Sequence, residues 1–134
     1  MFVVWSWKMC RARILIADDE TDIRNILRRL LLSEGYCVCE AGNGIEALAA
    51  AEHCEIDLAL LDITMPRMSG TEAVRQLRAN PRYAATPIML MTGNAPAGGA
   101  SQLGDIMLFA KPLDLRQVLS AIQQAVRSAR APLN

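Results

Sequence analysis

Charged and hydroxyl side chains stand directly after several apolar segments of this sequence. They belong to Asp18, Asp19, Asp62, Thr92 and Lys111. Carboxylates that lie close together repel one another unless a proton or a cation intervenes, and Mg²⁺ prefers hard oxygen ligands that it shares with water and phosphate. A lysine on the far side of such a cation can neutralise a phosphoryl group. These residue types therefore indicate magnesium-assisted phosphoryl chemistry.

Other common catalytic sites lack their residues here. His53 is the only histidine and lies in a predicted helix away from these segment ends, so no Ser/His/Asp or Cys/His set is available there. The acidic turn after Ala17 contains no glycine-rich loop for a bare nucleotide phosphate. We expect free thiols, buried or half-buried, and no disulfide scaffold. The cysteines are Cys10, Cys37, Cys39 and Cys54.

Alternating strand and helix patterns position the site residues. Short apolar runs predict strands; these cover 14–17, 36–41, 58–61, 87–91 and 106–110. Helical spacing of apolar residues or a high alanine content predicts helices; these cover about 23–31, 45–53, 71–79 and 115–126. Strands separated by helices predict a parallel sheet with helices on both faces, and ligands bind at the carboxyl ends of such strands.

The composition is that of one globular domain. The chain has 134 residues and a formal net charge of zero, which argues against a nucleic-acid module because such a module needs a basic face. The apolar residues 1–10 are too short to span a bilayer, which takes about 20 apolar residues. Lys8 follows the apolar run, whereas a signal peptide places its charge before it. An added strand or arm, a vector sequence and an early start codon all remain open for this segment.

Four stretches, taken together, resemble the response-regulator receiver domain of two-component signalling, in the CheY-like superfamily, over about Ala12 to Arg127. They read ILIADDE at 14–20, LDITMP at 61–66 with MSG at 68–70, MTG at 91–93 and AKP at 110–112. The resemblance implies an α/β, flavodoxin-like doubly wound sheet of five parallel strands in the order 2-1-3-4-5, with about five helices. Gly98-Gly99 predicts a short or irregular fourth helix.

The resemblance also implies a division of the chain and the roles of three residues. Residues 1–10 are an extension of unknown role, 11–130 the receiver and 131–134 a tail. Asp62 would accept a phosphoryl group from a phosphohistidine and form an acyl phosphate. Thr92 would donate its hydroxyl to a phosphoryl oxygen. Lys111 would pair with Asp62 before transfer and with the phosphate afterwards, next to a cis bond between Lys111 and Pro112.

A magnesium site follows from the same resemblance. Asp19 would ligate Mg²⁺ directly, Asp18 mainly through water, and Asp62 and the backbone carbonyl of Thr64 would complete the protein ligands. From the residues alone, Asp18 and Asp19 could instead cap the first helix. Glu20 is interpreted as part of the first helical turn, with metal contact as the weaker alternative.

The sequence departs from the family around the fourth helix and the fifth strand, the face through which receivers usually bind their downstream partners. Receivers usually carry Tyr or Phe three positions before the site lysine, where this chain has Leu108. Phe109 comes one place later and therefore points to the opposite face of the strand. Both this change and the weak fourth helix occur in receivers of hybrid sensor kinases and of stand-alone regulators. Thr64 and Asn94 stand where the family tunes water access to the acyl phosphate.

Three functions are weighed from these residues. The leading one is a phosphoacceptor module that binds a histidine kinase or histidine phosphotransfer protein, then a downstream partner, and catalyses only its own phosphorylation and dephosphorylation. A small aspartyl phosphatase would turn over phosphomonoesters. An interaction module with a decayed site would not need the intact acidic and lysine residues. We expect a cytoplasmic protein with no direct nucleic-acid or membrane partner.

Overall fold

One mixed sheet forms the centre of the molecule. The computed structural model describes residues 10–94 and 100–130, and in this part of the chain six strands are ordered β2-β1-β3-β4-β6-β5. They are β1 (Arg13–Ala17), β2 (Cys37–Ala41), β3 (Leu58–Asp62), β4 (Ile88–Thr92), β5 (Ala100–Leu103) and β6 (Ile106–Ala110). The first five in this spatial order are parallel. The predicted parallel sheet of order 2-1-3-4-5 is therefore confirmed, with β6 as its fifth strand.

Among the described residues, four helices and one 3-10 turn flank the sheet. They are α2 (Thr21–Ser33), α3 (Gly44–His53), α4 (Gly70–Ala79), α5 (Leu115–Arg130) and the 3-10 turn η1 (Pro81–Tyr83). Side-chain caps fix three of their starts: Asn43 accepts from the Glu46 amide, Ser69 from the Glu72 amide, and Asp114 from two amides of α5. Within the described ranges, no helix combines the length and the apolar character that a membrane crossing requires.

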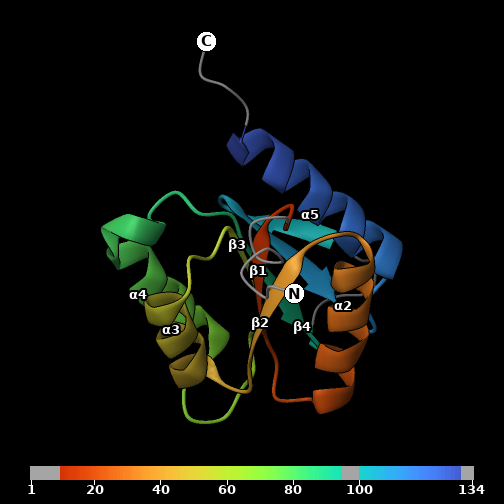
Figure 1. Cartoon of the computed structure of the whole chain (residues 1–134). Helices are drawn as coiled ribbons and strands as arrows, with labels where there is room; N and C mark the ends of the chain where they lie inside the picture. The colour runs from red at the N-terminus through yellow and green to blue at the C-terminus, as the bar shows by residue number, and fades with distance from the viewer. Residues whose placement is uncertain (1–9, 95–99, 131–134) are drawn as a thin grey trace, which may run out of the picture.

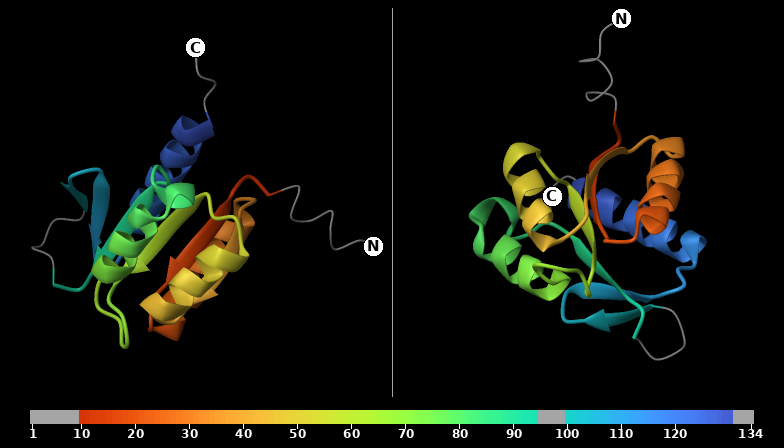
Figure 2. Two further views of the ribbon diagram at one scale, coloured as in Figure 1. Left: turned by 90° about the vertical axis from the view of Figure 1, so that its left-hand side faces the viewer. Right: turned by 90° about the horizontal axis from the view of Figure 1, so that it is seen from below.

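The helices cover the two faces of the sheet in pairs. Helices α3 and α4 lie on one face and α2 and α5 on the other (Figure 1; Figure 2). The strands β3 and β4 are buried along their whole length, as their continuous apolar runs predict. Burial on both faces holds these strands in register, and the register determines which residues reach the carboxyl edge.

The connection between β4 and β6 differs most from the expected pattern. Between these strands the structure describes an antiparallel strand, β5, which forms a hairpin with β6 at one edge of the sheet (Figure 2, left). Gly104, with φ of 61°, makes the turn between the two strands. No helix lies among the described residues of this connection. The Gly98-Gly99 pair, on which the prediction of a short or irregular fourth helix rests, lies outside the described residues.

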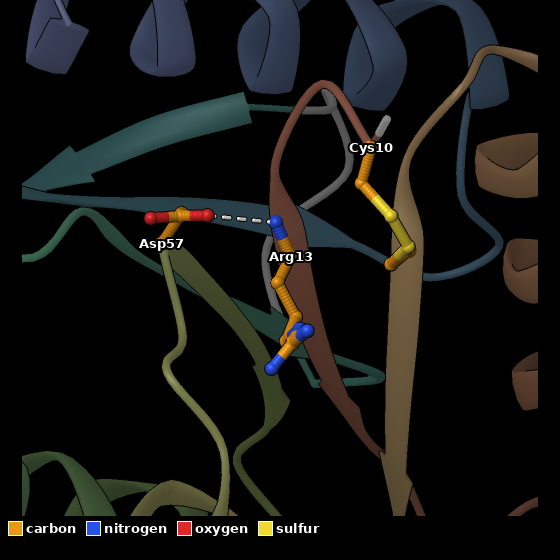
Figure 3. The surroundings of a disulfide bond; sticks show 4 residues. Cys10, Arg13 and Asp57 are labelled. Carbon is orange, nitrogen blue, oxygen red and sulfur yellow. Dashed lines mark hydrogen bonds between the residues drawn. A yellow bond between two sulfur atoms is a disulfide. The ribbon is translucent and has the colours of Figure 1, made fainter. Parts of the chain in front are cut away.

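The expectation that every cysteine is a free thiol is wrong for one pair. Cys10 and Cys37 form a disulfide whose Cα atoms are 5.5 Å apart, within the range that a disulfide requires (Figure 3). The approach of Cys10 to Cys37 follows from the parallel pairing of β1 with β2, in which the Cys37 amide donates to the Ala12 carbonyl. Only non-local strand pairing brings these two residues together, so sequence spacing does not reveal the bond.

The other two cysteines, Cys39 and Cys54, are half-buried free thiols. Burial and a hydrogen bond with Cys54 raise the pKa of Cys39 to about 11, so its thiol is protonated at neutral pH. Because only Cys39 and Cys54 are outside the disulfide, alkylation under denaturing conditions without a reductant should modify these two cysteines alone. Prior reduction should make all four cysteines available for alkylation. Intact mass measures the number of added groups. Four additions without reduction would contradict the disulfide.

Candidate functional site

Four strand ends meet at one edge of the sheet. Asp62 and Thr92 are the last residues of β3 and β4, while Asp18 and Lys111 directly follow β1 and β6. Because these four strands are adjacent and parallel, their carboxyl ends share an edge. Asp18, Asp62 and Thr92 are all buried. The structure thus brings together the groups that the sequence places at separate segment ends.

The Lys111 ammonium group is the centre of this arrangement. Its Nζ lies 2.8 Å from Asp18 Oδ2, 2.9 Å from Glu20 Oε1 and 3.2 Å from Asp62 Oδ2. An ammonium has three N–H donors, and each of these contacts is a hydrogen bond. Asp18 and Glu20 lie in the turn after β1 and Asp62 ends β3, so one cation joins carboxylates from two segments of the chain.

Backbone contacts hold the two buried aspartates in place. The Asp18 carbonyl accepts a 2.6 Å hydrogen bond from Arg24 Nη1, and Asp18 Oδ1 accepts from the Glu20 amide at 2.9 Å. Asp62 Oδ1 accepts from the Thr64 amide at 3.4 Å. Gly70 begins α4 directly against the Asp62 backbone, and its amide donates to the Ile63 carbonyl at 2.9 Å. The start of α4 therefore packs on the strand end that presents Asp62.

Burial and charge shift the pKa of two site groups. Burial, followed by repulsion from Asp18, raises the pKa of Asp62, and the Lys111 contact only partly opposes this. Burial lowers the pKa of Lys111, but hydrogen bonds with Asp18, Glu20 and Asp62 outweigh it and raise the pKa overall. Lys111 is therefore charged at neutral pH, and the ionised form of Asp62 is under electrostatic strain that a second cation would relieve.

The donor set fits a hard divalent cation. Carboxylate oxygens of Asp18, Glu20 and Asp62 lie within 4.8 Å of one another, and oxygen donors in small number suit Mg²⁺. Two of these carboxylates are buried, which leaves their charge short of solvation. The neighbouring Asp19 is exposed and does not belong to this group.

The remaining site residues surround the central cluster. The Thr92 hydroxyl accepts a hydrogen bond from the Asn94 amide at 3.1 Å, and the Thr92 carbonyl accepts from the Lys111 amide at 2.8 Å. Thr64 and Asn94 are exposed beside the buried cluster. The bond between Lys111 and Pro112 is cis, as the resemblance implies.

Sequence reasoning underestimated Glu20. This residue is the N-cap of α2, yet its side chain makes no capping hydrogen bond with the helix and instead binds Lys111. The only available sequence signal is that a third acidic residue follows Asp18 and Asp19. A contact between residues 91 positions apart leaves no local pattern.

Leu108 and Phe109 lie on opposite faces, as alternation along a strand predicts. Leu108 is half-buried and packs with the cluster on the α3 and α4 face. Phe109 is 1 % exposed and packs with the cluster on the α2 and α5 face. The single aromatic ring of β6 is thus held in the core and not at the position where receivers usually carry it.

Comparison with known families agrees with this geometry. Residues 14–123 match the model of the response regulator receiver domain. The chain belongs to this family. The receiver is 32% identical over 117 residues to sporulation initiation phosphotransferase F of Bacillus subtilis, a match that covers 87% of this chain and 94% of the relative. It is 37% identical over 120 residues to the transcriptional regulatory protein ResD of Bacillus subtilis, with coverage of 87% and 49%. The receiver thus spans about half of ResD.

Solved structures share the receiver's fold. The chemotaxis response regulator CheY4 of Vibrio cholerae matches with a TM-score of 0.74 and 28% identity, covering 85% of this chain and 98% of that one. The receiver domain of the sensor histidine kinase PA1611 of Pseudomonas aeruginosa matches with a TM-score of 0.74 and 26% identity, covering 86% and 97%. That structure has a magnesium ion coordinated in its active site cleft.

Proposed function

We propose that this receiver is a phosphoacceptor in a two-component phosphorelay, and that Asp62 carries the phosphoryl group. The observation that carries this proposal is the buried Asp62 carboxylate, which lies 3.2 Å from the Lys111 ammonium and beside a second buried carboxylate, Asp18. A nucleophile held between a cation and an acidic cluster suits phosphoryl transfer, because this reaction depends mainly on positioning and charge neutralisation.

The transfer exchanges one bond to phosphorus for another. A carboxylate oxygen of Asp62 attacks the phosphorus of a phosphohistidine whose other ring nitrogen is protonated. The new O–P bond forms as the P–N bond breaks, and the imidazole leaves as a neutral group that keeps this proton. Lys111 then donates to phosphoryl oxygens in place of the Asp62 carboxylate. The buried Thr92 hydroxyl, at the end of the adjacent strand, donates to another of these oxygens.

The magnesium ligands form part of the same proposal. Asp18, Asp19, Asp62 and the Thr64 carbonyl would hold Mg²⁺. When bound, the ion neutralises charge on the phosphoryl oxygens. The close acidic group supports this ligand set at Asp18 and Asp62, and the role of Asp19 follows from the family resemblance.

Phosphorylation would act as a switch between partners. The modification changes the local charge by about −1 to −2, at a site where one cation already contacts three carboxylates. A histidine kinase or a histidine phosphotransfer protein is the proposed donor, and a downstream protein would recognise the phosphorylated form. Because kinases make phosphohistidine from ATP, we place this reaction in the cytoplasm.

Intact mass spectrometry tests the phosphoacceptor. With acetyl phosphate and Mg²⁺, the chain should gain one phosphoryl group, and a chelator should prevent the gain because the acidic cluster is then left without its divalent cation. A single stoichiometric label also distinguishes this function from that of a phosphatase, which would hydrolyse a phosphomonoester through many turnovers. Steady turnover, or no adduct with the donor and Mg²⁺ both present, would contradict the proposal.

A further inference from the structure

Glu20 stands at the start of α2 but does not serve the helix. Its backbone is extended, as in an ordinary N-cap, while its side chain accepts no amide of the first turn. The carboxylate turns towards the strand ends and accepts from Lys111 Nζ at 2.9 Å. A capping role therefore does not explain the position of this side chain. Its hydrogen-bond partner, Lys111, belongs to the proposed phosphoryl-transfer site.

All three Lys111 donors are committed in this arrangement. The contacts with Asp18 and Glu20, at 2.8 and 2.9 Å, are shorter than the 3.2 Å contact with Asp62. A phosphoryl oxygen can accept a hydrogen bond from this ammonium only when one carboxylate releases it. The partners of Lys111 therefore limit how readily it reaches a phosphoryl group.

Burial distinguishes the three carboxylates. The side chains of Asp18 and Asp62 are 0% and 6% exposed, whereas that of Glu20 is 60% exposed. A buried carboxylate that loses its cation remains short of solvation, but an exposed one regains water. Glu20 is thus the partner that can release Lys111 at the smallest cost, and its side chain is the one that faces solvent.

We propose that Glu20 is a positioning residue that holds Lys111 at the solvent side of the site and competes with the incoming phosphoryl group for its ammonium. This inference rests on the proposed phosphoacceptor function. Glu20 acts as a brake on transfer, because its negative charge both retains Lys111 and repels an anionic donor. The same charge lies within 4.8 Å of the two buried carboxylates, so it favours a divalent cation there.

The Glu20→Gln variant separates these effects from a loss of folding. It keeps the shape of the side chain and removes one charge. At saturating Mg²⁺ and limiting acetyl phosphate, labelling should be faster by about fourfold, the size expected when Lys111 is freed from one partly exposed ion pair. Mg²⁺ binding without any donor, measured by amide shifts in NMR, should weaken by a similar factor. A variant that is only destabilised would label more slowly and would also bind Mg²⁺ more weakly.

Matched variants make the result specific. Glu52→Gln removes the same charge from an exposed position in the last turn of α3, and both measurements should match wild type. In a Lys111→Met background, Glu20→Gln should lose most of its acceleration, because no ammonium remains to compete for.

Two results would overturn the inference. One is a Glu20→Gln variant that labels no faster than wild type while wild type labels normally, which leaves the proposed function intact. The other is an undiminished acceleration in the Lys111→Met background, which would show that Glu20 acts by general charge and not through Lys111. Failure of wild type itself to label contradicts the phosphoacceptor function, and is thereby distinguished from failure of the Glu20 inference.

Discussion

In the Asp62→Asn variant we expect no phosphoryl adduct under conditions that label the wild-type chain. An amide is not a nucleophile towards phosphorus at neutral pH, and no second carboxylate replaces Asp62 at its position between Lys111 and Asp18. Intact mass after incubation with acetyl phosphate and Mg²⁺ measures the loss. Asp105→Asn, which changes an exposed carboxylate paired with Arg78, is the matched control and should label like wild type. A fully labelled Asp62→Asn variant would show that the acceptor is another residue.

The same variant should fold, and without Mg²⁺ it should be more stable than wild type at neutral pH. The pKa of Asp62 is raised by burial and by Asp18, so the folded state holds this proton more tightly than the unfolded chain does. Wild-type stability therefore falls as pH rises through the raised pKa, and asparagine avoids this loss. Thermal melts in a chelator should give similar midpoints for both proteins at acidic pH, and a higher midpoint for the variant near pH 7.

The opposite result would be informative about the site. If Asp62→Asn melts below wild type at neutral pH, the Lys111 contact stabilises the ionised carboxylate more than burial and Asp18 destabilise it. In that case the acidic cluster would be fully balanced by Lys111, and no electrostatic need for a second cation would remain.

Gly70→Ala should destabilise the fold by about 3 kcal/mol, within the usual range for a forced steric overlap in a packed region. A Cβ atom at this position would overlap the Asp62 carbonyl oxygen and approach the carbonyl carbon to 2.9 Å. Both atoms belong to the backbone, which cannot turn aside as a flexible side chain can. Without the overlap, alanine at a helical position would stabilise the chain by about 1 kcal/mol, so the sign of the effect is diagnostic.

Urea unfolding measures this change, and Gly93→Ala provides the control. A Cβ at Gly93 meets nothing within 4 Å, so its midpoint should stay close to that of wild type. Because the overlap at Gly70 falls on the residue that presents the acceptor carboxylate, the part of the Gly70→Ala population that folds should also label more slowly. Equal midpoints for the two variants would contradict the packing of α4 against the end of β3.

The strand ends were predictable because local patterns and topology act together. Continuous apolar runs predict β3 and β4, and a parallel sheet then places Asp62 and Thr92 at one edge whatever the details of side-chain packing. The apolar spacing also predicts the start of α5 at about Leu115, where Asp114 caps the helix. These features depend on residues that are close together in the sequence, so local sequence patterns predict them.

Three features depend on contacts between distant residues, and the sequence did not reveal them. The strand β5 contains no aromatic or β-branched residue and follows two glycines, so nothing local favours a strand; its pairing with β6 does. The bond between Cys10 and Cys37 follows from pairing of β1 with β2. The contact of Glu20 with Lys111 joins residues 91 positions apart in the sequence, and a helix-cap interpretation of Glu20 is locally reasonable.

The contacts of Lys111 also determine when, during synthesis of the chain, the acidic site is completed. They close loops of 93, 91 and 49 residues to Asp18, Glu20 and Asp62. Every other strand of the parallel sheet is translated before β6, so a nascent chain on the ribosome holds its acidic residues without their ammonium partner. The acceptor is therefore completed only when almost the whole domain has emerged. Under the proposed function, a partly synthesised chain would therefore lack the ammonium group that faces its acceptor carboxylate.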